Sequence, residues 1–150
     1  MDVTAEMEAQ AAPDAVFAWI DDLGRYPEWL GLVSRAEPAT AHPDDEGPAW
    51  SIDLRARIGP LARAKRLRMV RTVHEVPERA TFERREHDGR SHSPWILRAE
   101  LAPTGAGATR LVMRLHYGGT MFTPLADRLL RDEIDRSRPR LARLVEQPAG

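Results

Sequence analysis

A long run of alternating apolar and polar residues, from position 49 to position 117, constrains this chain more than any other feature. Within its stretches apolar side chains recur at every second residue, as at Trp50, Ile52 and Leu54, which is the period of a strand with one buried face. Short segments rich in Gly, Pro and Asp separate the stretches, as is typical of turns between antiparallel strands. The pattern predicts strands over residues 49–58, 62–76, 79–87, 93–102 and 109–117.

The first 24 residues indicate a strand followed by a helix. Residues 3–9 alternate with period two, as in a half-buried strand. Residues 12–24 repeat instead at helical spacing, and Pro13 suits the first turn while Gly24 suits the C-terminal cap. We therefore expect this helix to end at Gly24.

A second, very short helix is expected directly after the first. Pro27 favours the first turn of a helix, and Trp29 would lie on its apolar side. A short strand over residues 34–41 and a polar loop over residues 42–48 then lead into the alternating run.

The chain is expected to finish in one long amphipathic helix over residues 123–147. Thr123 suits its N-cap and Pro124 its first position, and apolar residues recur every three or four positions along one side. Pro139 lies inside this pattern and cannot donate a helical backbone hydrogen bond. We expect a kink or a split near Arg138.

Together these elements predict an α+β fold with an antiparallel sheet of six to seven strands and two short helices after the first strand. Such a sheet has one apolar face that needs a cover, and only the last helix is long enough to provide it. The length of the chain suits a single domain over residues 1–150.

Composition excludes several classes of protein. The chain has no cysteine, so disulfides, thiolate metal sites and a nucleophilic cysteine are excluded. Its net charge is −1, and Lys65 is the only lysine among 22 basic residues, so we expect no nucleic-acid partner. Because no apolar run of membrane-spanning length and no signal-peptide pattern is present, we expect a cytoplasmic protein without an integral membrane segment.

The order of elements, the segment APDAVFAWIDDLGRYPEWLGLV and the hairpin FERREHDGRSHSPWILRAEL resemble the helix-grip superfamily, also called START-like or SRPBCC. This superfamily groups START-type lipid-transfer domains, pollen-allergen-like proteins and polyketide cyclases or dehydrases. The resemblance implies a curved sheet that grips the C-terminal helix, with a ligand cavity between them. It also implies that the short helices brace the open side of the sheet, so that Tyr26 and Trp29 help to close the cavity; alternatively, these two aromatics only cap the core.

Strand registers can be estimated from the turns. If a two-residue loop at Pro77 joins its two strands, Arg71 faces Arg84 and the apolar pair Val73–Phe82 lies beside them. Registers across the following turns place Trp95 opposite Arg84 and Tyr117 opposite Trp95. Trp50 falls opposite Met69 or Arg71, and Phe82 opposite Leu97. The inward-facing row is therefore Arg71, Arg84, Trp95 and Tyr117.

Two arginines on an apolar face must be paired, hydrated or matched to an anionic ligand. In one interpretation they hold a carboxylate, phenolate or ketone oxygen of a flat, greasy ligand. In the other, Glu86 forms an internal network with them and Arg84 stacks on Trp95. The candidate ligand-binding residues are Tyr26, Trp29, Trp50, Met69, Arg71, Phe82, Arg84, Glu86, Trp95, Leu97, Met113 and Tyr117.

Metal and acid–base chemistry have weaker signals. The loop HPDDE over residues 42–46 has oxygen ligands without the fixed spacing of a cation site, so a solvated loop is expected, with no metal and no cofactor. His87 and His92 flank a turn and are expected to be exposed; the alternative is a role as acid or base at the mouth of a pocket.

Three functions follow from the residues and the resemblance together. The first is binding or transport of a small hydrophobic or aromatic molecule, such as a lipid, polyketide or isoprenoid, by a monomer or homodimer. The second is an enzyme similar to polyketide aromatase/cyclases, with Arg71, Arg84 and Tyr117 as catalytic candidates. The third is a non-catalytic module similar to co-chaperones, which uses the basic segment from Arg55 to Arg71 on an acidic partner.

Overall fold

The computed structural model describes residues 1–58, 61–118 and 124–147. Its N-terminal elements are β1 (Asp2–Ala9), α1 (Pro13–Ile20), the 3-10 helix η1 (Leu23–Glu28) and β2 (Val33–Pro38). They are followed by β3 (Ala49–Ile58), β4 (Leu61–Glu75), β5 (Arg79–Arg84), β6 (Trp95–Pro103), β7 (Thr109–Tyr117) and α2 (Pro124–Glu146).

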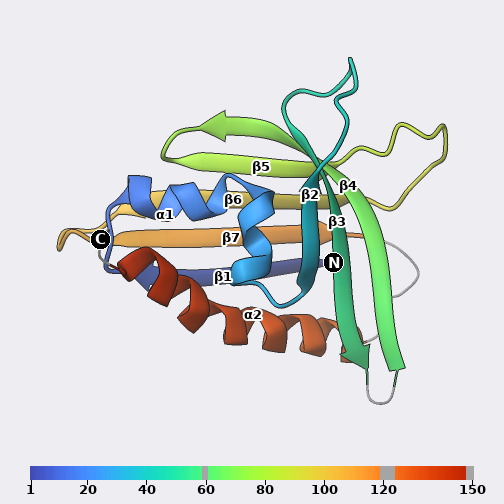
Figure 1. Cartoon of the computed structure of the whole chain (residues 1–150). Coiled ribbons are helices and arrows are strands. Elements are labelled where there is room, and N and C mark those ends of the chain that lie inside the picture. Colours follow the sequence, from blue (N-terminus) through green and yellow to red (C-terminus); the bar gives the residue numbers. More distant parts are fainter. Residues whose placement is uncertain (59–60, 119–123, 148–150) are drawn as a thin grey trace.

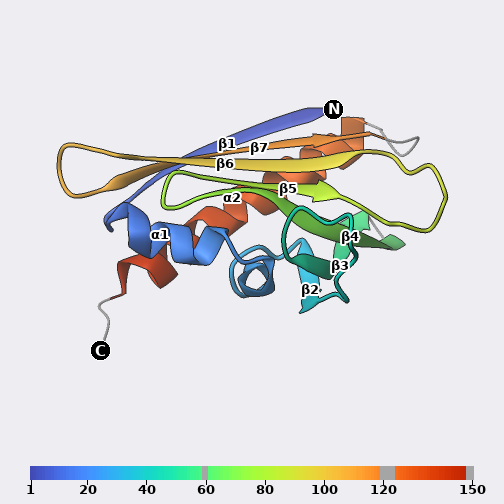
Figure 2. The ribbon, with the colours of Figure 1, turned by 90° about the horizontal axis from the view of Figure 1, so that it is seen from above.

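The described strands form one antiparallel seven-stranded sheet in the order β1-β7-β6-β5-β4-β3-β2. Figure 1 shows this sheet curving around α2, with β2, β3 and β4 turned across the other strands. Figure 2 shows α1 and α2 on the same side of the sheet. The expected α+β helix-grip fold, with two short helices after the first strand, is therefore confirmed.

The core lies between the sheet and the helices. Trp50, Ile52 and Leu54 alternate along β3 and are all buried, as their period-two spacing predicts. From α2, Leu141 and Val145 pack into the same cluster. No helix in the described part of the chain combines the length and the apolar character needed to cross a bilayer.

The boundary between the two short helices differs from the prediction. Helix α1 ends at Ile20, and Gly24 lies inside η1 instead of capping α1. The Asp22 carboxylate accepts a hydrogen bond of 2.8 Å from the backbone nitrogen of Gly24, and an aspartate in this role favours a new helix start. Pro27 consequently lies inside η1 and does not begin it.

Helix α2 continues through Pro139 without interruption, so of the two expected alternatives, a kink or a split, the split does not occur. The Ser137 hydroxyl donates to the carbonyl oxygen of Ile134 over 2.7 Å, and an Arg138 guanidinium nitrogen donates to the carbonyl oxygen of Glu6 over 3.2 Å. Side-chain hydrogen bonds thus supplement this turn and connect it to β1. The predicted N-cap, Thr123, lies outside the described residues.

The register between β4 and β5 also differs from the prediction. Three residues, 76–78, form the connection where two were expected, and a bulge in β4 shifts the pairing again. Arg71 therefore pairs with Phe82, and Arg84 pairs with Met69. The expected Arg71–Arg84 and Val73–Phe82 pairs are wrong. The estimated registers at Trp50–Met69, Phe82–Leu97 and Trp95–Tyr117 are confirmed.

Candidate functional site

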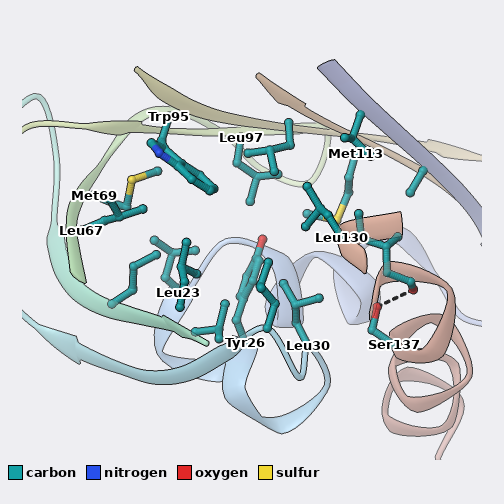
Figure 3. Close-up of a pocket in the computed structure, with 18 of the residues that line it drawn as sticks. Leu23, Tyr26, Leu30, Leu67, Met69, Trp95, Leu97, Met113, Leu130 and Ser137 are labelled. Carbon is teal, nitrogen blue, oxygen red and sulfur yellow. Dashed lines mark hydrogen bonds between the residues drawn. The ribbon is translucent and has the colours of Figure 1, made fainter. Parts of the chain in front are cut away.

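An apolar cavity of about 110 Å³ lies between the sheet and α2. Figure 3 shows Trp95, Leu97 and Met113 on its sheet side, with Tyr26 and Leu30 opposite. Almost all of its lining residues are apolar: Val3, Ala5, Leu23, Tyr26, Trp29, Leu30, Leu32, Val33, Ile52, Leu54, Leu67, Met69, Trp95, Leu97, Met113, Leu115, Leu130, Ile134 and Ser137.

Tyr26 forms an aromatic wall of this cavity. Its ring lies 4.7 Å from the Trp29 ring and 6.2 Å from the Phe82 ring, centre to centre. Its hydroxyl donates a hydrogen bond of 2.8 Å to the carbonyl oxygen of Ile20. Burial is the largest effect that raises the pKa of Tyr26 well above its usual value, and the nearby carboxylates of Asp21 and Asp22 raise it further. The phenol therefore stays protonated at neutral pH and serves as a neutral surface.

Few polar atoms border the cavity. The Ser137 hydroxyl is hydrogen-bonded to the carbonyl oxygen of Ile134, as the dashed line in Figure 3 shows. The indole nitrogens of Trp29 and Trp95 are buried and have no hydrogen-bond partner among the described residues. The site thus offers mainly apolar contact.

Six of the twelve predicted ligand-binding residues line the cavity. These six are Tyr26, Trp29, Met69, Trp95, Leu97 and Met113. The other six are not among the lining residues. Trp50 and Phe82 are buried behind the wall, with their rings packed edge to face at 5.7 Å.

The two predicted arginines are bonded to the protein itself. Arg71 donates to the backbone carbonyl oxygen of Asp21 over 3.0 Å. Arg84 forms an ion pair with Glu86 in which the two side chains are only 10% and 18% exposed. The cation that lies over the Trp95 ring is Lys65, where Arg84 was expected. The predicted row of four residues therefore breaks between Arg71 and Arg84, which do not pair, whereas Trp95 and Tyr117 still face each other.

Tyr117 keeps its predicted position opposite Trp95, with the ring centres 5.0 Å apart. It belongs to a second apolar cluster with Val3 and Leu130. Its hydroxyl lies 3.5 Å from the sulfur of Met1. Tyr117 therefore supports the sheet beside the cavity and does not border the cavity itself.

The HPDDE loop is more ordered than a solvated loop. The Asp45 side chain is 3% exposed and accepts two hydrogen bonds from Arg68, of 2.9 and 2.7 Å, and one of 2.8 Å from His87. The rings of His42 and His87 stack at 3.8 Å. Potential metal-ligating atoms of His42, Asp44 and His87 lie within 4.8 Å of one another.

His92 has a partner in the same region. Its ring nitrogen lies 2.7 Å from the Asp88 carboxylate. An open, polar pocket of about 370 Å³ adjoins the loop from Arg84 to Pro94. Both histidines proposed as an acid or base are therefore engaged with aspartates and lie away from the apolar cavity's lining.

Sequence reasoning missed the wall contributed by α2 and by the segment after η1. Leu130 and Ile134 from α2, together with Leu30 and Leu32, line the cavity. The apolar stripe of the last helix was visible in the sequence, but its spacing alone does not say which residues border a void and which fill the core.

Comparisons with known proteins agree with this architecture. Residues 1–146 match the family model described as polyketide cyclase/dehydrase and lipid transport. A START superfamily protein from Mycobacterium smegmatis has 15% identity and a TM-score of 0.73, over 99% of each chain. A Thermus thermophilus protein and a Chromobacterium violaceum protein are each 18% identical over 97% of both chains, with TM-scores of 0.69 and 0.68.

Among curated protein sequences, none matches this chain. The solved structures are too distant in sequence to indicate more than a shared fold. The family model covers every residue of the cavity walls, the sheet and α2, and the chain therefore belongs to the polyketide cyclase/dehydrase and lipid transport family.

Proposed function

We propose that this chain binds or carries a small hydrophobic or aromatic molecule in the cavity between the sheet and α2. The apolar cavity is the observation that carries the proposal. Protein interiors are normally packed without large voids, and an unfilled void costs stability. An apolar pocket retained between the sheet and α2 therefore favours a ligand. The absence of a spanning helix among the described residues fits the proposed cytoplasmic carrier.

The size of the cavity limits the ligand. An apolar cavity of about 150 Å³ accommodates benzene, so a volume of about 110 Å³ suits one small ring or a short alkyl chain. A complete polyketide, isoprenoid or lipid would require the walls to separate. Leu130 and Ile134 on α2 and Leu30 after η1 are among the lining residues that do not belong to the sheet, so movement of these segments would enlarge the site.

A binding role is favoured over cyclase chemistry by the position of the polar groups. Neither Arg71 nor Arg84, the proposed carbonyl-polarising residues, lines the cavity, and each has a bond within the protein, to the Asp21 backbone carbonyl and to the Glu86 carboxylate. Tyr26 is hydrogen-bonded and stays neutral. An interaction module similar to co-chaperones would need no internal cavity. The presence of the cavity therefore also favours a ligand carrier over such a module.

The proposal is tested by titrating the protein with toluene while the methyl groups of its Leu, Val, Ile and Met residues are observed by NMR. Saturable shifts are expected at Met113, Leu97 and Leu130, since they line the cavity. Ala5→Phe should abolish these shifts because Ala5 also lines the cavity and a phenyl ring would fill it.

Ala102→Phe is the matched control, because Ala102 is exposed on β6. This variant should bind toluene as the natural sequence does. Shifts confined to surface methyl groups, or equal binding by Ala5→Phe, would contradict the proposal. Native mass spectrometry of gently purified protein, followed by denaturing extraction, then identifies any molecule that copurifies.

A further inference from the structure

A lysine without a hydrogen bond or ion pair among the described residues lies next to residues that line the cavity. Lys65 shares one face of β4 with Leu67 and Met69, because the three residues alternate along the strand. Both of these neighbours line the cavity, and so does Leu54, which pairs with Lys65 across β3 and β4. Lys65 is not itself a lining residue; it extends this face of β4 by one inward position beyond Leu67.

The aromatic wall positions this ammonium group. The Nζ atom of Lys65 lies 5.8 Å from the centre of the Trp95 ring, and Trp95 lines the cavity. A cation over an indole face is held loosely by the ring's quadrupole and keeps its N–H groups available. A ligand in the cavity would therefore meet the ammonium of Lys65 next to its own apolar contact with Trp95.

The charges around Lys65 do not neutralise it. Burial is the largest effect that lowers the pKa of Lys65, and the positive charge of Arg84 lowers it further. The negative charge of Glu86 raises it. Glu86 is already held in an ion pair by Arg84. A partly desolvated cation beside a second cation is destabilised, and an anion brought to it would relieve both effects.

We infer that Lys65 is an anion-binding subsite of the cavity, which selects ligands that combine an apolar body with a carboxylate. This inference rests on the proposed function, since it requires the apolar body to occupy the cavity. It assigns to Lys65 the role that the sequence suggested for Arg71 and Arg84. Given the size of the cavity, the ligand class is a single-ring aromatic acid or a short-chain carboxylic acid.

The test compares two ligands of nearly the same shape, 4-ethylbenzoate and its neutral amide 4-ethylbenzamide, with cavity methyl shifts as the readout. The natural sequence should bind the benzoate about tenfold more tightly, as expected for one charge-assisted contact. Lys65→Met should remove this preference and leave the affinity for the benzamide unchanged. If Lys65→Met does not fold, Lys65→Gln is the second variant.

Arg66→Met is the matched control. Arg66 is the next residue on β4, points to the opposite face and is 70% exposed in its ion pair with Asp53. Its replacement removes the same charge from the protein and should keep the preference for the benzoate. An equal loss in Arg66→Met and Lys65→Met would overturn the inference, because net charge alone would then explain the preference.

Because Lys65 is the only lysine in the chain, its side-chain NMR signal can be assigned without ambiguity. Bound benzoate should raise the pKa of Lys65, whereas bound benzamide should not. If both ligands shift the cavity methyl groups equally and leave Lys65 unchanged, the inference is wrong and the proposed function stands. If neither ligand shifts them, the inference is overturned, and the toluene titration decides the proposed function separately.

Discussion

The Tyr26 hydroxyl donates a hydrogen bond of 2.8 Å to the carbonyl oxygen of Ile20, the last residue of α1. This contact spans the bend between α1 and η1 and is fully buried. It satisfies a carbonyl at a helix end, where no intrahelical donor exists. The same residue presents its ring to the cavity, so one side chain both fixes the helix pair and forms the ligand wall.

We predict that Tyr26→Phe lowers the free energy of unfolding by about 1–3 kcal/mol, because the buried carbonyl of Ile20 loses its donor. Toluene binding should remain, since the ring is retained. Urea unfolding measures the first effect and methyl NMR the second. Ser34→Ala is the control: its hydroxyl donates to the backbone carbonyl oxygen of Asp53 at an exposed site, and its loss should have little effect. Equal losses for the two variants would contradict the importance of burial.

Arg84→Leu should lower stability and leave toluene binding unchanged. The Arg84–Glu86 pair is largely buried, and removal of one partner leaves the other charge unpaired, at a cost of about 3 kcal/mol. Thermal unfolding and the toluene titration check the two parts. The double variant Arg84→Leu with Glu86→Leu should recover part of the loss. If a stable Arg84→Leu protein bound toluene more weakly, the prediction would be wrong, and Arg84 would contribute to ligand binding.

The fold was predictable because period and element order are local properties. The alternation along β3 and the apolar stripe of α2 predicted the sheet and its cover. The site was less predictable because it depends on register. One additional loop residue and one bulge in β4 placed Arg71 opposite Phe82, and neither feature has a strong local signal.

The roles of the charged residues depend in a similar way on the assembled chain. The sequence left two alternatives for Arg84, a ligand contact and an internal ion pair with Glu86. The structure has the ion pair, and that contact depends on how the chain leaves β5. Lys65 follows the same alternation as Leu67 and Met69, so its inward face could have been predicted. Its lack of a close ion-pair partner among the described residues could not, because that is a property of the assembled sheet.

Gly47→Ala should be strongly destabilising, since a β-carbon at this position would lie 2.4 Å from the backbone carbonyl oxygen of Arg71. This collision is with backbone, so the start of β3 would have to move away from β4. We expect a loss of about 1–3 kcal/mol, measured by urea unfolding. Gly105→Ala, in the turn between β6 and β7, is the control because a β-carbon there would meet no atom within 4 Å. Similar stabilities for the two variants would show that the strand start can move freely.

Asp45 should make the protein sensitive to acid. Hydrogen bonds from Arg68 and then His87 hold the pKa of its carboxyl well below the usual range, against the opposing effect of burial. A carboxyl whose pKa is lower in the folded than in the unfolded state stabilises the fold fully above the unfolded value of about 4. That contribution is lost progressively as the pH falls below about 4 towards the folded value.

Asp45→Asn should therefore lower the free energy of unfolding at pH 7 by about 3 kcal/mol, because Arg68 loses its buried partner. The variant should also show a shallower decline of stability below about pH 4 than the natural sequence, since the linked proton is no longer taken up. Urea unfolding at a series of pH values measures both effects. Asp44→Asn, at a side chain that is 81% exposed, should change neither. Parallel pH profiles for the natural sequence and Asp45→Asn would mean that other carboxyl groups determine the acid response.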